Sequence, residues 1–306
     1  MGGLSLSLLR LIACCYAIQP WWLRRFEGKL LGGLLRVTGF RSAVIRRNLE
    51  LAYPGSAPDV VRLRKKMLAR AYSHFGNLVL DLTLVLGPFR WFTLRNASMI
   101  GLEHFWEARQ KGKGVIFLAS HVGNWEIMAA IGGLQGMDPL LVTKHLKPEW
   151  LHQAFEKGRS TCEVRGTYEP KTWRDIMRQL KENKTVGIVL DQYAGPPIGV
   201  RVPFFGIPVG TSSALAMLAR RTGAPVLPVV SYQNADGKWI VDVRPPLKWI
   251  EAETKELEVA WNTAEYTRII ENDIRRHPEQ WLWTHRRFKG DLSDLKDGEW
   301  TEGRLR

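Results

Sequence analysis

A histidine and a glutamate stand five residues apart near the middle of the chain, directly after a run of apolar residues. His121 and Glu126 belong to the segment 120–126, which reads SHVGNWE and follows the apolar run 114–119. The run predicts a buried strand, and the apolar stretch from 127 predicts a helix, so the pair lies at a strand-to-helix turn. Such turns lie at the carboxyl edge of an α/β sheet, where ligands bind. A histidine held there by a carboxylate can take the proton of an alcohol, as acyl transfer to a hydroxyl requires.

The chemistry expected of this pair is direct transfer, without a covalent enzyme intermediate. His121 is the predicted general base, and Glu126 is predicted to hold the ring tautomer and stabilise the imidazolium. Backbone N–H groups around Val122, Gly123 and Asn124 are predicted to receive the substrate oxyanion, because Gly123 allows a close approach. No serine or cysteine stands in a nucleophile elbow of the sequence. A histidine and an acid at this spacing also occur by chance, so the rest of the chain has to support the pair.

The elements that would position the pair follow from the pattern after residue 101, where apolar runs alternate with amphipathic stretches. Strands are expected at 115–119, 140–142, 186–190, 226–230 and 239–243, and helices at 126–134, 148–158, 171–182, 212–222 and 257–276. This order predicts an α/β fold with a single, largely parallel sheet flanked by helices. Thr211 is the expected N-cap of the helix at 212–222, and Gly223 is its expected stop.

Charge is concentrated in the first quarter of the chain. The 306 residues hold 44 Lys+Arg and 30 Asp+Glu, a net charge of +14, and 13 basic against 3 acidic side chains fall within 1–75. Large apolar residues such as Trp21, Trp22 and Phe26 alternate with these charges, a pattern typical of an anionic bilayer surface. No helix-turn-helix, zinc-finger or RNA-binding motif accompanies the charge, so a nucleic-acid partner is not expected.

The N-terminus predicts a membrane-associating helix. Residues 4–18 are mostly apolar but include Arg10. A spanning helix needs about 20 apolar residues, and a central arginine costs roughly 2.5–3.5 kcal/mol. We therefore expect an interfacial or weak membrane anchor at 1–25 rather than a secure span. One domain at 26–306 would follow, made of a basic helical lead-in at 26–95, with a long helix over 59–86, and an α/β catalytic core at 96–306.

Cysteine and histidine usage predicts neither disulfides nor a metal site. The three cysteines form no disulfide framework, and the seven histidines do not cluster with cysteines or carboxylates at ligand spacing. This usage is typical of a reducing, cytosolic face. No cofactor is expected.

Three further segments lie near predicted strand ends, and each has a simple structural explanation when taken alone. In the segment 191–195, Asp191 and Gln192 could be a helix cap or an ion pair. The segment 202–211 could be a packed turn, and the segment 278–289 could be aromatic core beside basic residues. Taken together and in this order, the segments resemble the bacterial lipid A biosynthesis (late) acyltransferases of the lysophospholipid acyltransferase superfamily. The resemblance covers nearly the whole chain: the apolar N-terminus, RRNL at 46–49, 121–126, 191–192, FFG at 204–206 with Pro208 and Thr211, TGAPV at 222–226, and 278–289.

The resemblance implies a glycerolipid acyltransferase-like fold and a transfer reaction. The family moves an acyl chain from a thioester, usually on acyl carrier protein, to a hydroxyl of a membrane-bound glycolipid, here a lipid A precursor at the cytoplasmic face of the bacterial inner membrane. Its His-x4-acid pair falls on His121 and Glu126. Arg159, with Arg165 as the alternative, falls where the family uses a basic residue, which we expect to bind phosphate; an ordinary surface ion pair is the competing interpretation of Arg159. Asp191 and Gln192 are expected to shape the site.

Other functions stay open at this point. The chain lacks the Glu-Gly-Thr-Arg block of glycerol-phosphate acyltransferases, which argues against a lysophosphatidate acceptor. The same fold would also serve another glycolipid, such as a phosphatidylinositol mannoside, or an aminolipid. A non-catalytic basic membrane-binding protein is the alternative of a different class. The basic surface would also steer an acidic carrier protein toward the site.

Overall fold

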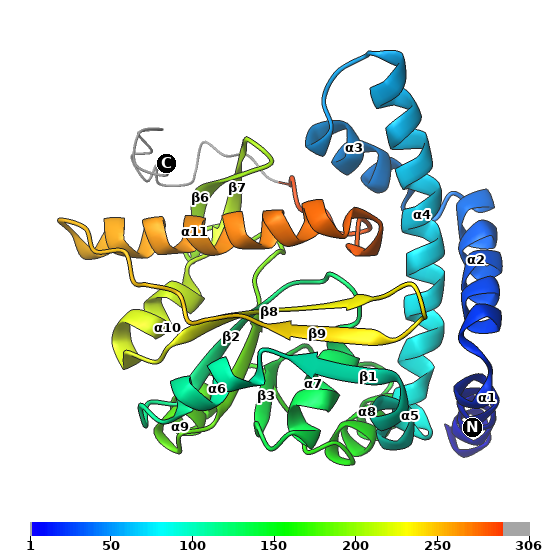
Figure 1. Ribbon diagram of the computed structural model, residues 1–306, viewed down its shortest axis with the longest axis horizontal. Coiled ribbons are helices and arrows are strands. Elements are labelled where there is room, and N and C mark those ends of the chain that lie inside the picture. Colours follow the sequence, from blue (N-terminus) through cyan, green and yellow to red (C-terminus); the bar gives the residue numbers. More distant parts are fainter. Residues whose placement is uncertain (1, 290–306) are drawn as a thin grey trace.

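A seven-stranded sheet forms the centre of the molecule in the computed structural model, which describes residues 2–289 (Figure 1). Its strand order is β1-β9-β8-β2-β5-β3-β4, and only the β8–β9 pairing is antiparallel. The strands are β1 (Ala97–Ile100), β2 (Val115–Ala119), β3 (Pro139–Val142), β4 (Arg165–Thr167), β5 (Thr185–Val189), β8 (Val226–Gln233) and β9 (Trp239–Val243). The predicted α/β fold with a largely parallel sheet is confirmed.

Helices precede the sheet and then alternate with its strands. The lead-in consists of α1 (Gly2–Ile18), α2 (Trp21–Val37), α3 (Ser42–Ala52), α4 (Pro58–Thr83), the 3-10 turn η1 (Leu84–Leu86) and α5 (Phe89–Asn96). The alternating helices are α6 (Leu102–Arg109), α7 (Trp125–Leu134), α8 (Glu149–Ser160), α9 (Thr172–Lys181), α10 (Ala214–Thr222) and α11 (Lys255–Arg276), with the 3-10 turn η2 (Pro278–Gln280) after α11. Residues 290–306 of the predicted domain lie outside the described part.

The segment 202–211 differs from its prediction. Instead of a packed turn, the chain forms an antiparallel hairpin of β6 (Gly199–Phe204) and β7 (Ile207–Ser212). Thr211 lies in β7, and Ser213 occupies the N-cap position of α10, so the predicted cap is wrong. Gly223 ends α10 with a φ of 64°, as predicted for a left-handed C-cap.

Strand β2 is the centre of the core. All five of its residues are buried, as expected for a parallel strand covered by helices on both faces. Ile116 and Leu118 pack in one hydrophobic cluster, whereas Val115 and Phe117 pack in another. This burial fixes the carboxyl end of β2, where the SHVGNWE turn begins.

Helix α2 packs closely on α4 through glycines and leaves its outer face apolar. A Cβ on Gly32 would lie 2.2 Å from the Tyr72 carbonyl oxygen, and one on Gly76 would lie 2.2 Å from the Gly28 carbonyl oxygen, so the two helices touch backbone to backbone. The outer face, which we call the α2 stripe, is 60–86% exposed at Trp22, Phe26, Leu30, Leu34 and Val37. Within residues 2–289, no helix combines the length and the apolar character that crossing a bilayer requires.

Candidate active site

His121 lies two residues beyond β2 and pairs with a carboxylate from the neighbouring strand. Its Nδ1 is 2.7 Å from Oδ1 of Asp191, which follows β5. Asp191 Oδ2 accepts two further hydrogen bonds, from the His121 backbone N–H at 2.8 Å and from the Trp281 indole N–H at 2.7 Å. Because β2 and β5 are parallel neighbours, their carboxyl ends bring residues 121 and 191 together.

The electrostatics of this pair leave one imidazole nitrogen free as a proton acceptor. Burial alone would raise the pKa of Asp191, but the His121 imidazole and the N–H donors of His121 and Trp281 hold it well below its ordinary value. An ionised carboxylate only accepts hydrogen bonds, so the proton of the neutral ring lies on Nδ1. Nε2 therefore carries the lone pair that general-base catalysis requires.

An amide donates to this unprotonated nitrogen, and a second histidine lies beside it. Gln192 Nε2 lies 3.3 Å from His121 Nε2 and 3.5 Å from His285 Nε2, and the two imidazole centroids are 4.6 Å apart. Burial, followed by the proximity of His121, lowers the pKa of His285 to about 4, so this ring is neutral. Asn48 of α3 donates to the carbonyl oxygens of Trp283 and His285 at 2.8 and 2.7 Å and fixes the segment.

Glu126 does not hold the imidazole. Its Oε2 and Oε1 accept from Nε and Nη2 of Arg159 at 2.9 and 2.6 Å, and Arg159 Nη1 also donates to Glu156 at 3.0 Å. Both Glu126 and Arg159 are buried. Burial lowers the pKa of Arg159, but the two glutamates outweigh it and the pKa is raised.

The predictions for Glu126 and Arg159 are corrected by this geometry. Glu126 lies in the first turn of α7 and bonds to Arg159 of α8, so Asp191 takes the place on the ring that was predicted for Glu126. The Arg159 guanidinium is buried, and each of its three nitrogens donates to a carboxylate, so it is already paired and does not face the His121 ring as a phosphate ligand would. The competing interpretation, a surface ion pair, fails as well, because the pair is buried.

The comparisons with known proteins agree on one family. The family described as bacterial lipid A biosynthesis acyltransferase matches residues 5–290. The chain belongs to this family. It is 27% identical over 264 residues to the lipid A biosynthesis lauroyltransferase of Escherichia coli (strain K12), covering 83% of this chain and 81% of that protein. A phosphatidylinositol mannoside acyltransferase of Mycolicibacterium smegmatis is 28% identical over 203 residues, 64% of each chain.

The chain is thus an acyltransferase, and the predicted resemblance is confirmed. The lipid A biosynthesis palmitoleoyltransferase of Escherichia coli (strain K12) is 27% identical over 282 residues, covering 88% of this chain and 86% of that protein. These matches cover both the lead-in helices and the sheet, so the family includes the whole described architecture.

The backbone of this acyltransferase uses Gly123 and Asn124 to build the turn. The Gly123 N–H donates to the Gln280 carbonyl oxygen at 2.8 Å, and the Asn124 N–H donates to Ser231 Oγ at 3.0 Å. A Cβ on Gly123, whose φ is +68°, would lie 2.1 Å from the Ser231 carbonyl oxygen, so glycine serves close packing on β8. Asn124 Oδ1 caps α7 by accepting from two backbone N–H groups at 3.1 Å. The predicted oxyanion site is therefore wrong for Gly123 and Asn124, because both N–H groups are already engaged.

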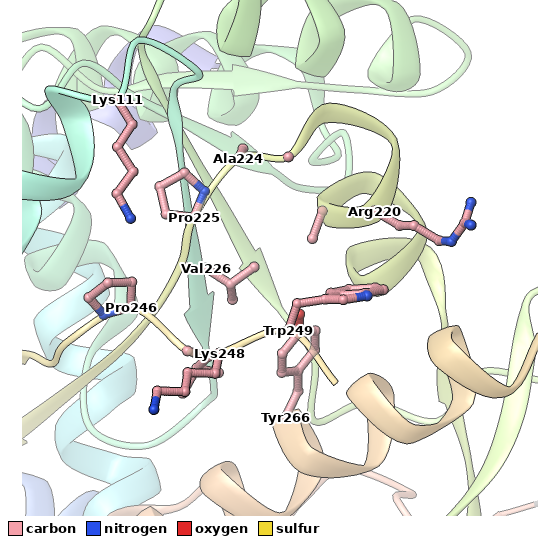
Figure 2. Close-up of a pocket in the computed structure, with 12 residues that line it drawn as sticks. Lys111, Arg220, Ala224, Pro225, Val226, Pro246, Lys248, Trp249 and Tyr266 are labelled. Atoms are coloured by element: carbon pink, nitrogen blue, oxygen red, sulfur yellow. The ribbon is translucent and has the colours of Figure 1, made fainter. Parts of the chain in front are cut away.

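The cavity in Figure 2 lies at the opposite edge of the sheet from His121. It measures about 580 Å³ and is lined by Val226, Trp249, Tyr266 and Lys248, among others. Val226 is the first residue of β8 and pairs in parallel with Ile116 of β2, so the cavity opens at the amino end of these strands. It does not belong to the acyltransferase site.

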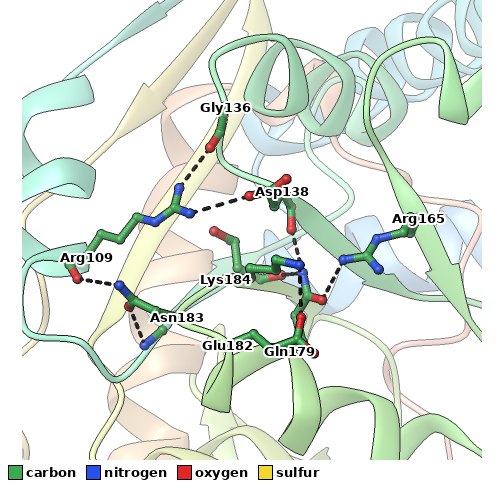
Figure 3. Close-up of polar contacts among 10 residues, drawn as sticks. Arg109, Gly136, Asp138, Arg165, Gln179, Glu182, Asn183 and Lys184 are labelled. Carbon is green, nitrogen blue, oxygen red and sulfur yellow. Dashed lines mark hydrogen bonds and ion pairs between the residues drawn. The ribbon is translucent and has the colours of Figure 1, made fainter.

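Arg165 also lies at the edge of the sheet where the parallel strands begin. Its guanidinium donates to Gln179 Oε1 at 2.8 Å, and Gln179 Nε2 donates to the Asp138 carbonyl oxygen at 2.6 Å (Figure 3). Arg165 opens β4 and Asp138 precedes β3, so this network closes the amino ends of the strands. The alternative that Arg165 binds phosphate at the acyltransferase site is not supported by this position.

Three residues in the segment 278–289 have roles that no sequence pattern indicated. Trp281 holds Asp191, and His285 faces His121. Arg287 is fully buried and donates to the carbonyl oxygens of Gln192 and Gly210 and to Thr211 Oγ1. The segment is visibly rich in polar and aromatic residues, but the partners of Trp281 and Arg287 lie 76 to 95 positions away and that of His285 lies farther still.

Proposed function

We propose that this acyltransferase moves a fatty acyl chain from an acyl carrier protein thioester to a hydroxyl of a lipid A precursor. The observation that carries the proposal is the Asp191–His121 pair, whose unprotonated Nε2 accepts from Gln192 and faces His285 at the carboxyl edge of the sheet. Family membership supports acyl transfer as the reaction class. The related lauroyltransferase and palmitoleoyltransferase support a lipid A acceptor.

The proposed reaction has two proton movements and one exchange of bonds. The acceptor hydroxyl gives its proton to His121 Nε2 as its oxygen bonds to the thioester carbonyl carbon. Asp191 stabilises the imidazolium while the carbonyl oxygen carries the negative charge. The carbon–sulfur bond then breaks, the carbonyl re-forms, and the leaving thiolate takes the proton from the imidazolium.

Gln192 and His285 are the proposed donors to the oxyanion. The Gln192 amide lies between the two imidazoles, and the neutral His285 ring can donate one N–H without competing as a base. Within residues 2–289, no serine or cysteine side chain hydrogen-bonds to a ring nitrogen of His121. A direct transfer without an acyl-enzyme follows from this arrangement.

Arg41 and Lys144 are the cations we assign to a substrate phosphate in place of Arg159. Both are exposed, and both lie close enough to His285 to lower its pKa. They flank the site from different elements, the start of α3 and the loop after β3. A phosphate on the acceptor or on the carrier's prosthetic arm would meet two cations that are not buried in ion pairs.

An acidic carrier protein has a matching basic surface next to the site. Exposed cations gather on α3 and the first half of α4: Arg46, Arg47, Arg62, Lys65, Lys66 and Arg70. Helix α3 is fixed to the active-site segment through Asn48, so a carrier held there lies beside His285. Activity with the carrier-bound donor should fall as ionic strength rises.

We propose the cytoplasmic face of the inner membrane as the location and the α2 stripe as the contact with lipid. Arg25, Lys29 and Arg36 flank the stripe, so its apolar residues can enter the interface while the cations meet anionic headgroups. Replacing Trp22 and Phe26 by serine should weaken sedimentation with anionic vesicles at least about 100-fold, because each buried side chain contributes about 1.5–3 kcal/mol. Vesicle binding equal to that of the wild type would refute this placement.

The experiment that tests the function supplies the purified protein with acyl-carrier-protein donor and either a lipid A precursor or a phosphatidylinositol mannoside. We expect transfer to the lipid A precursor, and loss of transfer in His121→Gln. The mannoside arm is included because the mycobacterial acyltransferase is similar over 64% of this chain. Transfer to the mannoside alone would refute a lipid A precursor as the acceptor. Full activity of His121→Gln would refute His121 as the general base.

A further inference from the structure

A chain of buried polar groups joins the N-terminal helix α1 to the catalytic turn. The Tyr16 hydroxyl donates to Asp81 Oδ1 at 2.8 Å, and Asn124 Nδ2 donates to Asp81 Oδ2 at 3.4 Å. Tyr16, Asp81 and Asn124 are 4%, 6% and 1% exposed. The three residues lie on α1, on α4 and at the start of α7, so the chain crosses from the lead-in helices into the sheet domain.

Burying the Asp81 carboxylate costs free energy that simple helix packing would not require. Burial raises the pKa of Asp81 to about 6, against the opposing effects of Tyr16, Arg24 and Asn124. An apolar contact would join α1 to α4 without a buried carboxylate. The carboxylate differs from such a contact in one respect, because its second oxygen reaches Asn124.

Asn124 carries this connection into the site. It lies three residues after His121, and its Oδ1 accepts the N–H groups of Glu126 and Ile127 that open α7. His74 lies seven residues before Asp81 on the same face of α4 and is buried beside the Gly123 backbone, which opposes the lowering of its pKa by burial. Helix α4 therefore bonds to the turn through Asp81 and lies against it at His74.

We propose that Tyr16 and Asp81 are positioning residues that hold the His121 turn from the N-terminal helices. The inference rests on the proposed function, since it concerns the rate of the same transfer. Helix α1 would then have two faces with different roles. Leu8, Leu11 and Ile12 are exposed on its outer face, whereas Tyr16 is buried and bonds to Asp81. A displaced turn would misalign the base and slow the chemical step rather than weaken substrate binding.

The test replaces Tyr16 by phenylalanine and uses Tyr266→Phe as the matched control. Tyr266 is also buried, and in the described part of the chain its hydroxyl makes no hydrogen bond. We expect Tyr16→Phe to lower kcat about 10-fold to 100-fold, with both KM values and vesicle binding unchanged, while Tyr266→Phe keeps the wild-type kcat. A Tyr16→Phe variant with the wild-type kcat would overturn the proposal, as would a loss of rate that only follows the fraction of protein unfolded.

A double variant tests whether Tyr16 acts through Asp81. Asp81→Leu removes both acceptor oxygens at nearly the same side-chain size, so it should lower kcat by itself, and adding Tyr16→Phe should lower it no further. Independent, multiplying effects would overturn the proposed order of contacts. Should Tyr16→Phe fail to fold, Asp81→Leu decides alone, and a wild-type kcat refutes the inference. A wild-type protein without transfer activity would instead refute the proposed function.

Discussion

Replacing Asp191 by asparagine keeps the shape of the side chain, and the surrounding contacts determine how the new amide sits. Asp191 Oδ2 accepts from the His121 backbone N–H at 2.8 Å and from the Trp281 indole N–H at 2.7 Å. The amide oxygen has to occupy this place, because an NH2 group there would oppose two donors. The NH2 group then faces His121 Nδ1, which the aspartate contacts at 2.7 Å.

The consequence is a change of tautomer at the base. A donor beside Nδ1 requires that nitrogen to be unprotonated, so the ring proton moves to Nε2 and blocks the position that should receive the substrate proton. In serine proteases the corresponding exchange lowers kcat about 10⁴-fold. We expect Asp191→Asn to lower kcat by about 10³-fold to 10⁴-fold, with both KM values within about twofold of the wild type.

The assay compares Asp191→Asn with Glu126→Gln at saturating donor and acceptor, using initial rates of labelled acyl transfer and thermal unfolding as a check on folding. Glu126→Gln should mainly lower stability, because the partner of Glu126 is Arg159 and not His121. A folded Asp191→Asn with nearly the wild-type kcat, beside a folded Glu126→Gln that is inactive, would refute the assignment of the pair.

Three further outcomes follow from single contacts. Arg159→Met leaves the Glu126 carboxylate buried and unpaired, so the free energy of unfolding should fall by about 3–5 kcal/mol in urea titrations; an unchanged midpoint would contradict this. His285→Ala should lower kcat about 100-fold, whereas His277→Ala, whose ring stacks on Tyr232, should keep kcat within about twofold; equal effects would remove His285 from the site. Burial lowers the pKa of His74 from 6.5 to about 4, so only the unfolded chain binds this proton as pH falls through that window. His74 should therefore contribute about 2 kcal/mol to the loss of stability between about pH 8 and pH 5, beside a loss of the same sign from His285, and a His74→Gln variant whose stability falls as far as that of the wild type would contradict that origin.

The strand that positions the site was predictable because its signal is local. Five successive apolar residues at 115–119 give the buried strand with its correct bounds, and the turn after it places His121 at the carboxyl edge. The partner of His121 was not predictable from spacing, because Asp191 lies 70 residues away and reaches it through the pairing of β2 with β5. The residue with the right spacing, Glu126, is drawn away by Arg159, 33 residues further along the chain.

In the lead-in helices, too, one feature was predictable from the local sequence and another was not. The alternation of basic and large apolar residues predicts an interfacial surface, and the α2 stripe is exposed in the structure. The inward face was not predictable, because nothing in the local pattern distinguishes Tyr16 or Asp81 from other residues of their helices. Their roles depend on where α1 and α4 meet the turn at Asn124.

The position of the proton on the His121 ring shows which carboxylate controls this imidazole. In protein carrying ¹⁵N-labelled histidine, with the signals of His121 assigned by comparison with His121→Gln, we expect a proton on Nδ1 and an unprotonated Nε2. Glu126→Gln should leave this pattern unchanged, and Asp191→Asn should move the proton to Nε2. A wild-type ring protonated on Nε2 alone, or one that responds to Glu126→Gln and not to Asp191→Asn, would contradict the account.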